Sequence, residues 1–383
     1  RLTRLYLDRG RMLEHSGRFA EAVASYRELE TTARLRDDRQ MECAAIERLV
    51  TCFVEPNDMH SWTEAQLLLR RGLHLARDLN DADLELRLLR AQMVGESHYG
   101  HDEAGRAAGL AAIELARACG NDEQLGYLAN DLATHLRLSG YAQEGQVLAE
   151  EARHIFYDRT NYAMLADNLS QQAWSDMHLL RLDEADNFIA QCETLCRQID
   201  NGWNLSIVLL TRATRERMRG HLGEALRLYR ESMTVGQAAD LALAETMVPA
   251  QLGALLRMLG MWDEAEGLHL QALAAAKAVN PFLCKAIEAQ LALDAFEAGK
   301  ISEGTQWLNS AQDREVRGAI GRGWLCMTDV ACAAAAQAKA TGAWASALVV
   351  ADEALAETMA RGLIYYLPTV HLLRGQALLH LNC

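Results

Sequence analysis

Apolar and polar positions follow one another along the chain with the period of an α-helix, and turns interrupt them at regular intervals. The clearest turn lies in residues 258–265. Gly260 follows an apolar run, and Trp262 and Ala265 lie on one face of the next predicted helix. Glycine readily takes the positive φ that ends a helix, and a small side chain lets two helices approach closely. We therefore expect a helical hairpin with helices at about 244–259 and 263–279.

The same pattern recurs at intervals of about 40 residues. The small residues that align with Ala265 are Ala22, Ala65, Ala104, Gly145, Ala185, Ala225, Gly304 and Ala347. Twelve positions earlier lies a second column of small residues, interrupted in the second and third copies by Phe53 and Gln92. Its members are Gly10, Ala133, Ala173, Ala213, Gly253, Ala292 and Ala335. Small residues on both helices allow close antiparallel packing. The repeat predicts nine hairpins, and residues 363–381 predict one further helix.

Composition supports an all-α fold. Only 4 prolines occur among 383 residues, and 50% of the residues are hydrophobic, which is enough for a large core. Helix-forming residues dominate, and no run of alternating β-branched residues predicts a strand. We expect one domain over residues 1–383, folded as a right-handed α-solenoid of about nine hairpins and a C-terminal helix.

Charge and cysteine content narrow the range of possible partners and cellular compartments. The formal net charge of −14 argues against nucleic acid and anionic membranes as partners. The 9 cysteines are odd in number and irregularly spaced, which favours free thiols in a reducing compartment. No signal peptide or long apolar segment is recognisable, so we expect a cytoplasmic location. The chain starts with Arg1 and not with Met, and we interpret it as a piece of a longer protein.

The repeated pattern Gly-x-aromatic-x-Glu-Ala, as in residues 17–22, is followed four positions later by an aromatic residue, Tyr26 or Tyr229. It resembles the tetratricopeptide repeat, although the period of about 40 residues exceeds the 34 of that family. Longer units of this kind resemble the sensor domain of MalT-like STAND regulators, which are multidomain signal-transduction ATPases. The resemblance implies a domain that binds an inducer or partner and transmits this event to an ATPase or effector outside the chain.

An alternative is a peptide- or protein-binding scaffold without an ATPase, similar to quorum-peptide receptors with long tetratricopeptide units. No phosphate loop of the form G-x-x-x-x-G-K-[ST] occurs in the chain. Residues 318–323 contain glycines but lack the Lys-Ser/Thr pair, and we predict a connection between two helices there. Under either interpretation, the partner is a small-molecule inducer, a peptide or a protein, and self-association through a parent protein remains open.

The tetratricopeptide resemblance implies that the first helix of each hairpin lines a concave, ligand-binding face. The aligned residues expected on this face are Tyr127, Asn130, Thr134, Arg137, Asp167, Ser170, Trp174, His178, Thr214, Arg217, Arg257 and Met258. Arg137, Arg217 and Arg257 recur at one repeat position and predict a basic stripe for an anionic or carboxylate-bearing ligand. The alternative is that these arginines pair with acidic residues of neighbouring helices.

Polar residues interrupt the apolar pattern in the fifth and sixth copies. Gln172, Asp176, Arg212 and Glu216 stand where other copies carry leucine. Because buried polar groups must be paired, we predict a contact between Asp176 and Arg212 of adjacent hairpins. This contact is either part of a functional site or a purely structural ion pair.

Candidate catalytic and metal-binding residues are few. His98 and His101 flank a turn, and Cys192 and Cys196 share a helix face, but neither pair is accompanied by further ligands at suitable spacing. No catalytic triad is recognisable, since triad members are neighbours in space and not in sequence. The sequence predicts a binding protein without catalytic residues, metal or cofactor.

Overall fold

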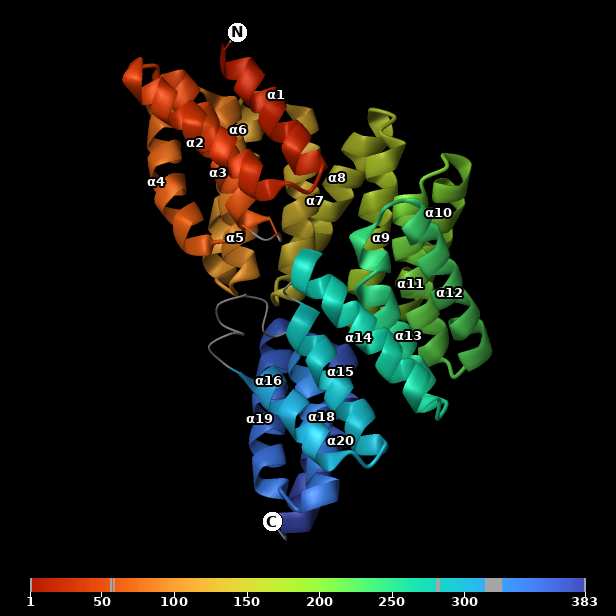
Figure 1. Ribbon diagram of the computed structural model, residues 1–383. Coiled ribbons are helices and arrows are strands. Elements are labelled where there is room, and N and C mark those ends of the chain that lie inside the picture. Colours follow the sequence, from red (N-terminus) through yellow and green to blue (C-terminus); the bar gives the residue numbers. More distant parts are fainter. Residues whose placement is uncertain (1, 56, 58, 280–282, 314–325, 382–383) are drawn as a thin grey trace. The chain divides into compact units, whose positions relative to one another are not determined.

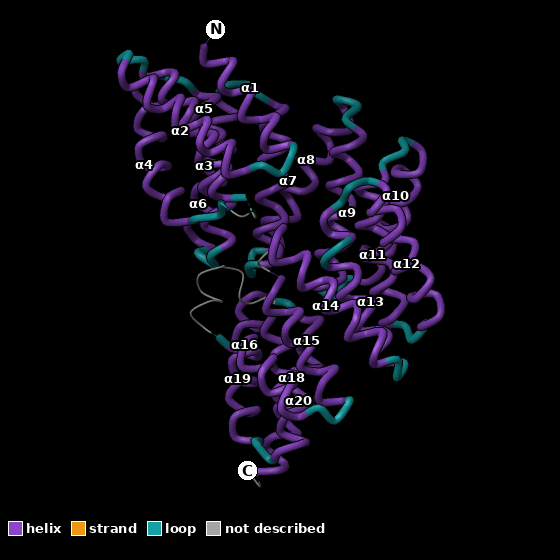
Figure 2. The backbone as a smooth tube through the Cα atoms, viewed as in Figure 1, coloured by secondary structure: helices purple, strands orange, loops and turns teal. Residues whose placement is uncertain are grey.

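The computed structural model describes residues 2–55, 57, 59–279, 283–313 and 326–381, and the regular structure in these ranges is entirely helical (Figure 2). Consecutive helices pair into hairpins and form a tetratricopeptide-like solenoid (Figure 1), which confirms the predicted fold class. The chain divides into two compact units, Arg1–Leu132 and Ala133–Cys383, here called unit 1 and unit 2. None of the described helices combines the length and the hydropathy of a membrane span.

Each hairpin consists of a first helix, here called the A helix, and a second, the B helix. The helices that begin in unit 1 are α1 (Leu2–His15), α2 (Phe19–Leu35), α3 (Arg39–Val54), α4 (Trp62–Leu79), α5 (Ala82–His98), α6 (Asp102–Ala118) and α7 (Asp122–Leu138). Those of unit 2 are α8 (Ala142–Asp158), α9 (Tyr162–His178), α10 (Leu182–Gln198), α11 (Gly202–Met218), α12 (Leu222–Ala238), η1 (Ala242–Ala244), α13 (Met247–Met258), α14 (Trp262–Val279), α15 (Cys284–Glu297), α16 (Ile301–Gln312), α18 (Met327–Thr341), α19 (Trp344–Arg361), η4 (Ile364–Tyr366) and α20 (Leu367–Leu381).

Local chemistry explains where the helices begin and end. Asn161 and Asn201 cap α9 and α11, since their side-chain oxygens accept hydrogen bonds from the amides of Met164 and Asn204. At the end of α13 the backbone of Gly260 has φ of 78°, as expected for a glycine that stops a helix. The predicted turn is confirmed.

A buried small residue marks the register of each B helix. Helix α14 begins at Trp262, three residues before Ala265, and the other B helices follow the same rule. In the third copy α6 begins at Asp102, so the buried residue is Gly105, whereas Ala104 is exposed. The predicted register was wrong by one residue there, because two small residues stand side by side and only packing chooses between them.

The small residues are required by close contacts within the hairpins. A Cβ atom added to Gly145 would lie 2.7 Å from the carbonyl oxygen of Ala133, and one added to Gly304 would lie 2.7 Å from the ring of Phe296. Such distances leave no room for a larger side chain. The two columns of small residues therefore mark where an A helix touches its B helix.

Two predicted boundaries shift because proline stands in a first helical turn. Helix α13 begins at Met247 and not near 244, and Pro249 is its third residue. The last predicted helix, 363–381, is divided into η4 and α20, with Pro368 as the second residue of α20. Proline lacks an N–H and disfavours helical geometry in the preceding residue, so it sits in a first turn and not inside a helix. The predicted connection at 318–323 lies outside the described residues.

The core consists of successive clusters between neighbouring helices. In unit 1 one cluster joins Tyr26, Ile46 and Leu69, from three consecutive helices. In unit 2 a cluster around Tyr229 and Leu255 links α11 to α14. Within each unit the hairpins are thus held by their neighbours, as in other solenoids, and one A helix lies beside the next.

Candidate ligand-binding site

In unit 2 the A helices line a cavity of about 460 Å³. Its wall is formed by five successive A helices, α9, α11, α13, α15 and α18, together with η4 and α20. We call it the A-helix cavity. Its volume is in the range of small-ligand sites, and its lining combines many apolar side chains with a few polar ones, as such sites do.

Four aromatic rings form one part of the lining. The rings of Trp174 and His178 are 4.2 Å apart, and His178 also contacts Tyr365 and Tyr366 with ring-centroid distances of 5.5 and 5.7 Å. The Nδ1–H of His178 donates to the carbonyl oxygen of Trp174 at 2.8 Å. Burial lowers the pKa of His178 to about 4, so the ring is neutral at pH 7 and its Nε2 is an acceptor.

The predicted contact between Asp176 and Arg212 is absent. Asp176 pairs with Arg137 of the preceding A helix, and both side chains are almost fully buried, with 4% and 2% of their surface exposed. Arg212 instead donates from Nη1 to Glu193 of α10 at 2.9 Å. Burial raises the pKa of Asp176, and the adjacent guanidinium opposes this effect. The repeat alignment identified the polar positions, but it could not tell which neighbouring helix each side chain faces.

The other two arginines of the predicted stripe have different partners. Arg257 donates to Asp294 at 3.0 Å and to the side-chain oxygen of Gln290 at 2.6 Å. Arg217 donates to the side-chain oxygen of Gln251 at 3.1 Å, and the phenol of Tyr365 is a further polar neighbour. Within the described part of the chain, Arg217 therefore forms no ion pair, although Arg257 does.

An acidic side chain, Asp329 of α18, lies in the same cavity. Its Oδ1 accepts a hydrogen bond from Gln290 at 2.6 Å, and it has no ion-pair partner among the described residues. Burial raises the pKa of Asp329 to about 6, while the charges of Arg257 and Arg217 act in the opposite direction. Among the residues that the structure describes, Arg217 and Asp329 are thus a cation and an anion of the cavity that have only neutral hydrogen-bond partners.

A buried network behind the wall holds Arg257 in place. The two ring nitrogens of His269 lie 2.5 Å from a carboxylate oxygen of Asp294 and 3.0 Å from the carbonyl oxygen of Ala250. Asp294 in turn accepts from Arg257. These contacts join α13, α14 and α15, so this arginine belongs to the structural wall of the cavity.

Six of the predicted residues line the A-helix cavity: Trp174, His178, Thr214, Arg217, Arg257 and Met258. Met258 is 62% exposed. The other six are not in the lining: Tyr127, Asn130, Thr134, Arg137, Asp167 and Ser170. Tyr127 and Asn130 belong to unit 1. The predicted ligand contacts stay a prediction.

Several residues of the lining were missed in the sequence. Asp329 precedes its small residue, Ala347, by the same number of positions as Asp167 precedes Ala185, so the repeat alignment contained a signal for it. Tyr365 and Tyr366 had no such signal. They follow the last complete hairpin, and only the path of the folded chain brings them to α9.

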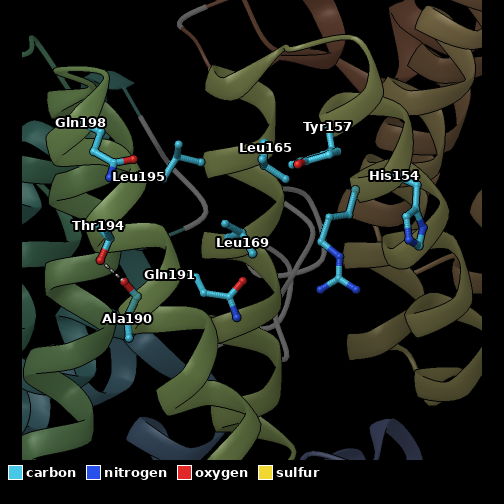
Figure 3. A pocket seen from close by; sticks show the side chains of 10 residues that line it. His154, Tyr157, Leu165, Leu169, Ala190, Gln191, Thr194, Leu195 and Gln198 are labelled. Atoms are coloured by element: carbon cyan, nitrogen blue, oxygen red, sulfur yellow. Dashed lines mark hydrogen bonds between the residues drawn. The ribbon is translucent and has the colours of Figure 1, made fainter.

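A second pocket, of about 630 Å³, lies between α8, α9 and α10 (Figure 3). Leu165 and Leu169 of α9 lie between the side chains of α8 and those of α10 in this view. The hydroxyl of Thr194 in α10 donates to the carbonyl oxygen of Ala190 in the same helix. The pocket is larger, but it does not bring together oppositely charged groups with neutral partners. We therefore regard the A-helix cavity as the candidate site.

The histidines and cysteines considered as ligands serve other contacts. His101 lies 2.7 Å from a carboxylate oxygen of Glu96. Cys192 and Cys196 are buried, with their sulfur atoms 3.8 Å apart. In the described ranges of the chain, no three His, Cys, Asp or Glu side chains gather in a way that could hold a metal ion.

Comparison with known proteins gives fold similarity alone. No protein-family model matches the chain, and no curated protein matches its sequence. A Rap protein complexed with Competence and Sporulation Factor is similar in fold, with a TM-score of 0.61 and 11% identity over 93% of this chain and 99% of that chain. The Rap conjugation gene regulator of plasmid pLS20, in complex with the Phr* peptide, has a TM-score of 0.61 and 12% identity over 90% of this chain and 98% of that one.

A third similar structure is a STAND protein with a tetratricopeptide repeat sensor from Pyrococcus horikoshii. Its TM-score is 0.51 and its identity 15%, over 89% of this chain and 53% of that chain. This chain therefore spans about half the length of the STAND protein. Identities this low show a shared architecture and not a shared activity. The chain has a tetratricopeptide-like helical repeat fold.

Proposed function

We propose that the chain is a binding scaffold that takes a peptide in the A-helix cavity. The observation that carries this proposal is the convergence of five A helices on one cavity that contains aromatic rings, a cation and an anion. Extended peptides and helices commonly bind in the grooves of helical repeats. Two of the similar structures are complexes, one with Competence and Sporulation Factor and one with the Phr* peptide, which supports a peptide as the ligand.

The test is a selection from a random peptide library on the purified chain, with two variants that differ in the pocket they fill. Ala254→Trp fills the A-helix cavity, whereas Ala190→Trp places the same side chain in the pocket between α8 and α10. Selected peptides are expected to lose at least about tenfold in affinity for the first variant and to bind the second like the unchanged chain. Circular dichroism melting of both variants verifies that they fold.

Two results would overturn the proposal. One is a selection that enriches no peptide above the background of an unrelated helical protein. The other is a set of peptides whose affinity is the same for the Ala254→Trp variant and the unchanged chain, which would place binding elsewhere.

A second candidate is the sensor part of a STAND-type regulator. The fold similarity to the STAND protein with a tetratricopeptide repeat sensor favours it. In that case ligand capture would bias an attached ATPase between two states. The gene sequence on either side of the part that encodes this chain tests this candidate. If the chain is part of a STAND protein, that sequence must encode a G-x-x-x-x-G-K-[ST] phosphate loop.

A further inference from the structure

We propose that the A-helix cavity binds a small zwitterion, a dipeptide or a free amino acid with an apolar side chain, with Arg217 at its carboxylate and Asp329 at its ammonium group. The inference rests on the proposed function, because it names the ligand of the same cavity. It follows from the contrast between these two residues and the other charged groups around the cavity.

The charge of Arg257 is already compensated within the protein. Its guanidinium contacts Asp294 at 3.0 Å, and Asp294 also contacts His269. Arg217 occupies the same repeat position and donates to Gln251 just as Arg257 donates to Gln290, but it has no carboxylate at ion-pair distance among the described residues. A guanidinium has five N–H donors, so Arg217 retains donors for a ligand carboxylate.

Asp329 shows the complementary arrangement. Its one hydrogen-bond donor in the described structure is the neutral amide of Gln290, which leaves acceptor capacity on both carboxylate oxygens. A ligand ammonium group would give Asp329 a positively charged hydrogen-bond donor, which it lacks among the described residues. The aromatic side chains of Trp174 and Tyr366 belong to the same lining, and aromatic rings attract a nearby cation.

The size of the cavity suits a small ligand. Its volume of about 460 Å³ lies in the range of about 300–1,000 Å³ that small-ligand sites have. An amino acid or a dipeptide belongs to this class of ligand. Apolar side chains such as Met247, Ile287 and Leu210 fit an apolar ligand side chain.

The experiment is isothermal titration calorimetry of the unchanged chain with two groups of probes. The first group contains free L-amino acids and the dipeptides of leucine, methionine, phenylalanine and tyrosine. The second contains the best dipeptide of the first group with its amino end acetylated, with its carboxyl end amidated, or with both changes. We expect either modification to lower the affinity at least about tenfold, because each removes a charge-assisted hydrogen bond.

Matched variants assign each end of the probe. Arg217→Met should remove the preference for a free carboxylate over an amide, and Asp329→Asn should remove the preference for a free ammonium over an acetyl group. Arg230→Met and Asp183→Asn change the same residue types at exposed positions and should leave the affinity unaltered. Thermal melts of all four variants confirm folding.

The ligand is either a free amino acid or a dipeptide. The class of probe that binds with the higher affinity identifies which of the two it is. The inference is overturned if no free-ended probe binds, if probes blocked at both ends bind as tightly as free ones, or if both cavity variants keep the wild-type preferences. Peptides from the library selection that remain sensitive to Ala254→Trp would then leave the proposed scaffold function standing. If that selection also fails, both proposals fall.

Discussion

At the scale of single residues, unit 2 contains two kinds of charged group. Arg137 with Asp176, and Arg257 with Asp294, form pairs in which each charge meets its opposite. Asp329 is different, because its hydrogen-bond partner is neutral. A carboxylate held in this way destabilises a fold, and such costs are typical of binding sites, where function and stability conflict.

Replacing Asp329 by Asn should therefore stabilise the protein, but only at a pH at which the buried carboxyl group is ionised. The pKa of Asp329 is raised from 3.8 to about 6 by burial, with Arg257, Arg217 and His269 as the charged or titratable groups that lower it. Cys332 and Tyr366 are the other titratable neighbours. Between these two pH values Asp329 is protonated in the folded state and ionised in the unfolded state. The stability that this protonation contributes is therefore complete below pH 3.8 and is lost as the pH rises through 6.

We expect Asp329→Asn to raise the free energy of unfolding at pH 7.5 by up to about 3 kcal/mol, and to change it little at pH 4. Urea denaturation at pH 4, 5, 6 and 7.5 measures this difference. Asp183→Asn, on the exposed side of α10, is the control and should show no such trend. A difference that is independent of pH would contradict the assigned role of Asp329.

At the scale of helices, the hairpin depends on a small residue at the contact between its two helices. Gly145 is packed against the backbone of α7, with room for a hydrogen atom and not for a methyl group. Gly267 of α14 has open space around it, since no atom lies within 4 Å of an added Cβ. The two glycines therefore separate the effect of packing from the effect of helix propensity.

Gly145→Ala should lower the free energy of unfolding by about 1–3 kcal/mol, because the helices of the hairpin must move apart. Gly267→Ala should raise it by up to about 1 kcal/mol, since alanine favours the helix and meets no obstacle. Both values come from urea denaturation at one pH. Equal effects of the two changes would show that the close contact in the fourth hairpin is unimportant.

At the scale of the folded chain, unit 2 brings its last elements back to its first ones. Tyr365 and Tyr366 of η4 contact His178 of α9. The end of α19 lies against the turn after α7, where a Cβ added to Gly140 would be 2.9 Å from the carbonyl oxygen of Ala360. This closure adds two aromatic side chains to the wall of the A-helix cavity.

Changing both Tyr365 and Tyr366 to Ala should loosen that wall. We expect faster amide hydrogen exchange in the last turn of α9, around Met177 and His178, while α16 keeps its protection. Mass spectrometry of exchanged peptides measures both regions. Tyr157→Ala, at an exposed position of α8, is the control. Unchanged exchange in α9 would mean that η4 does not support this wall.

The sequence alone determined the class of fold, the hairpin repeat and most of the helix boundaries. These properties depend on local chemistry. A 3.6-residue period selects the helix, glycine at positive φ ends it, and small residues at a constant spacing mark where two helices meet. The tetratricopeptide resemblance also predicted that Trp174, Arg217 and Arg257 share one face, and all three belong to the lining of the A-helix cavity.

Only the tertiary structure decided which of these residues meet. Asp176 turned to Arg137 and not to Arg212, Gly105 and not Ala104 was buried, and η4 closed onto α9. Each of these outcomes depends on the directions of side chains across helix interfaces and on small rotations added over several hairpins. Such rotations accumulate over distance in a solenoid, so no local pattern in the sequence contains them.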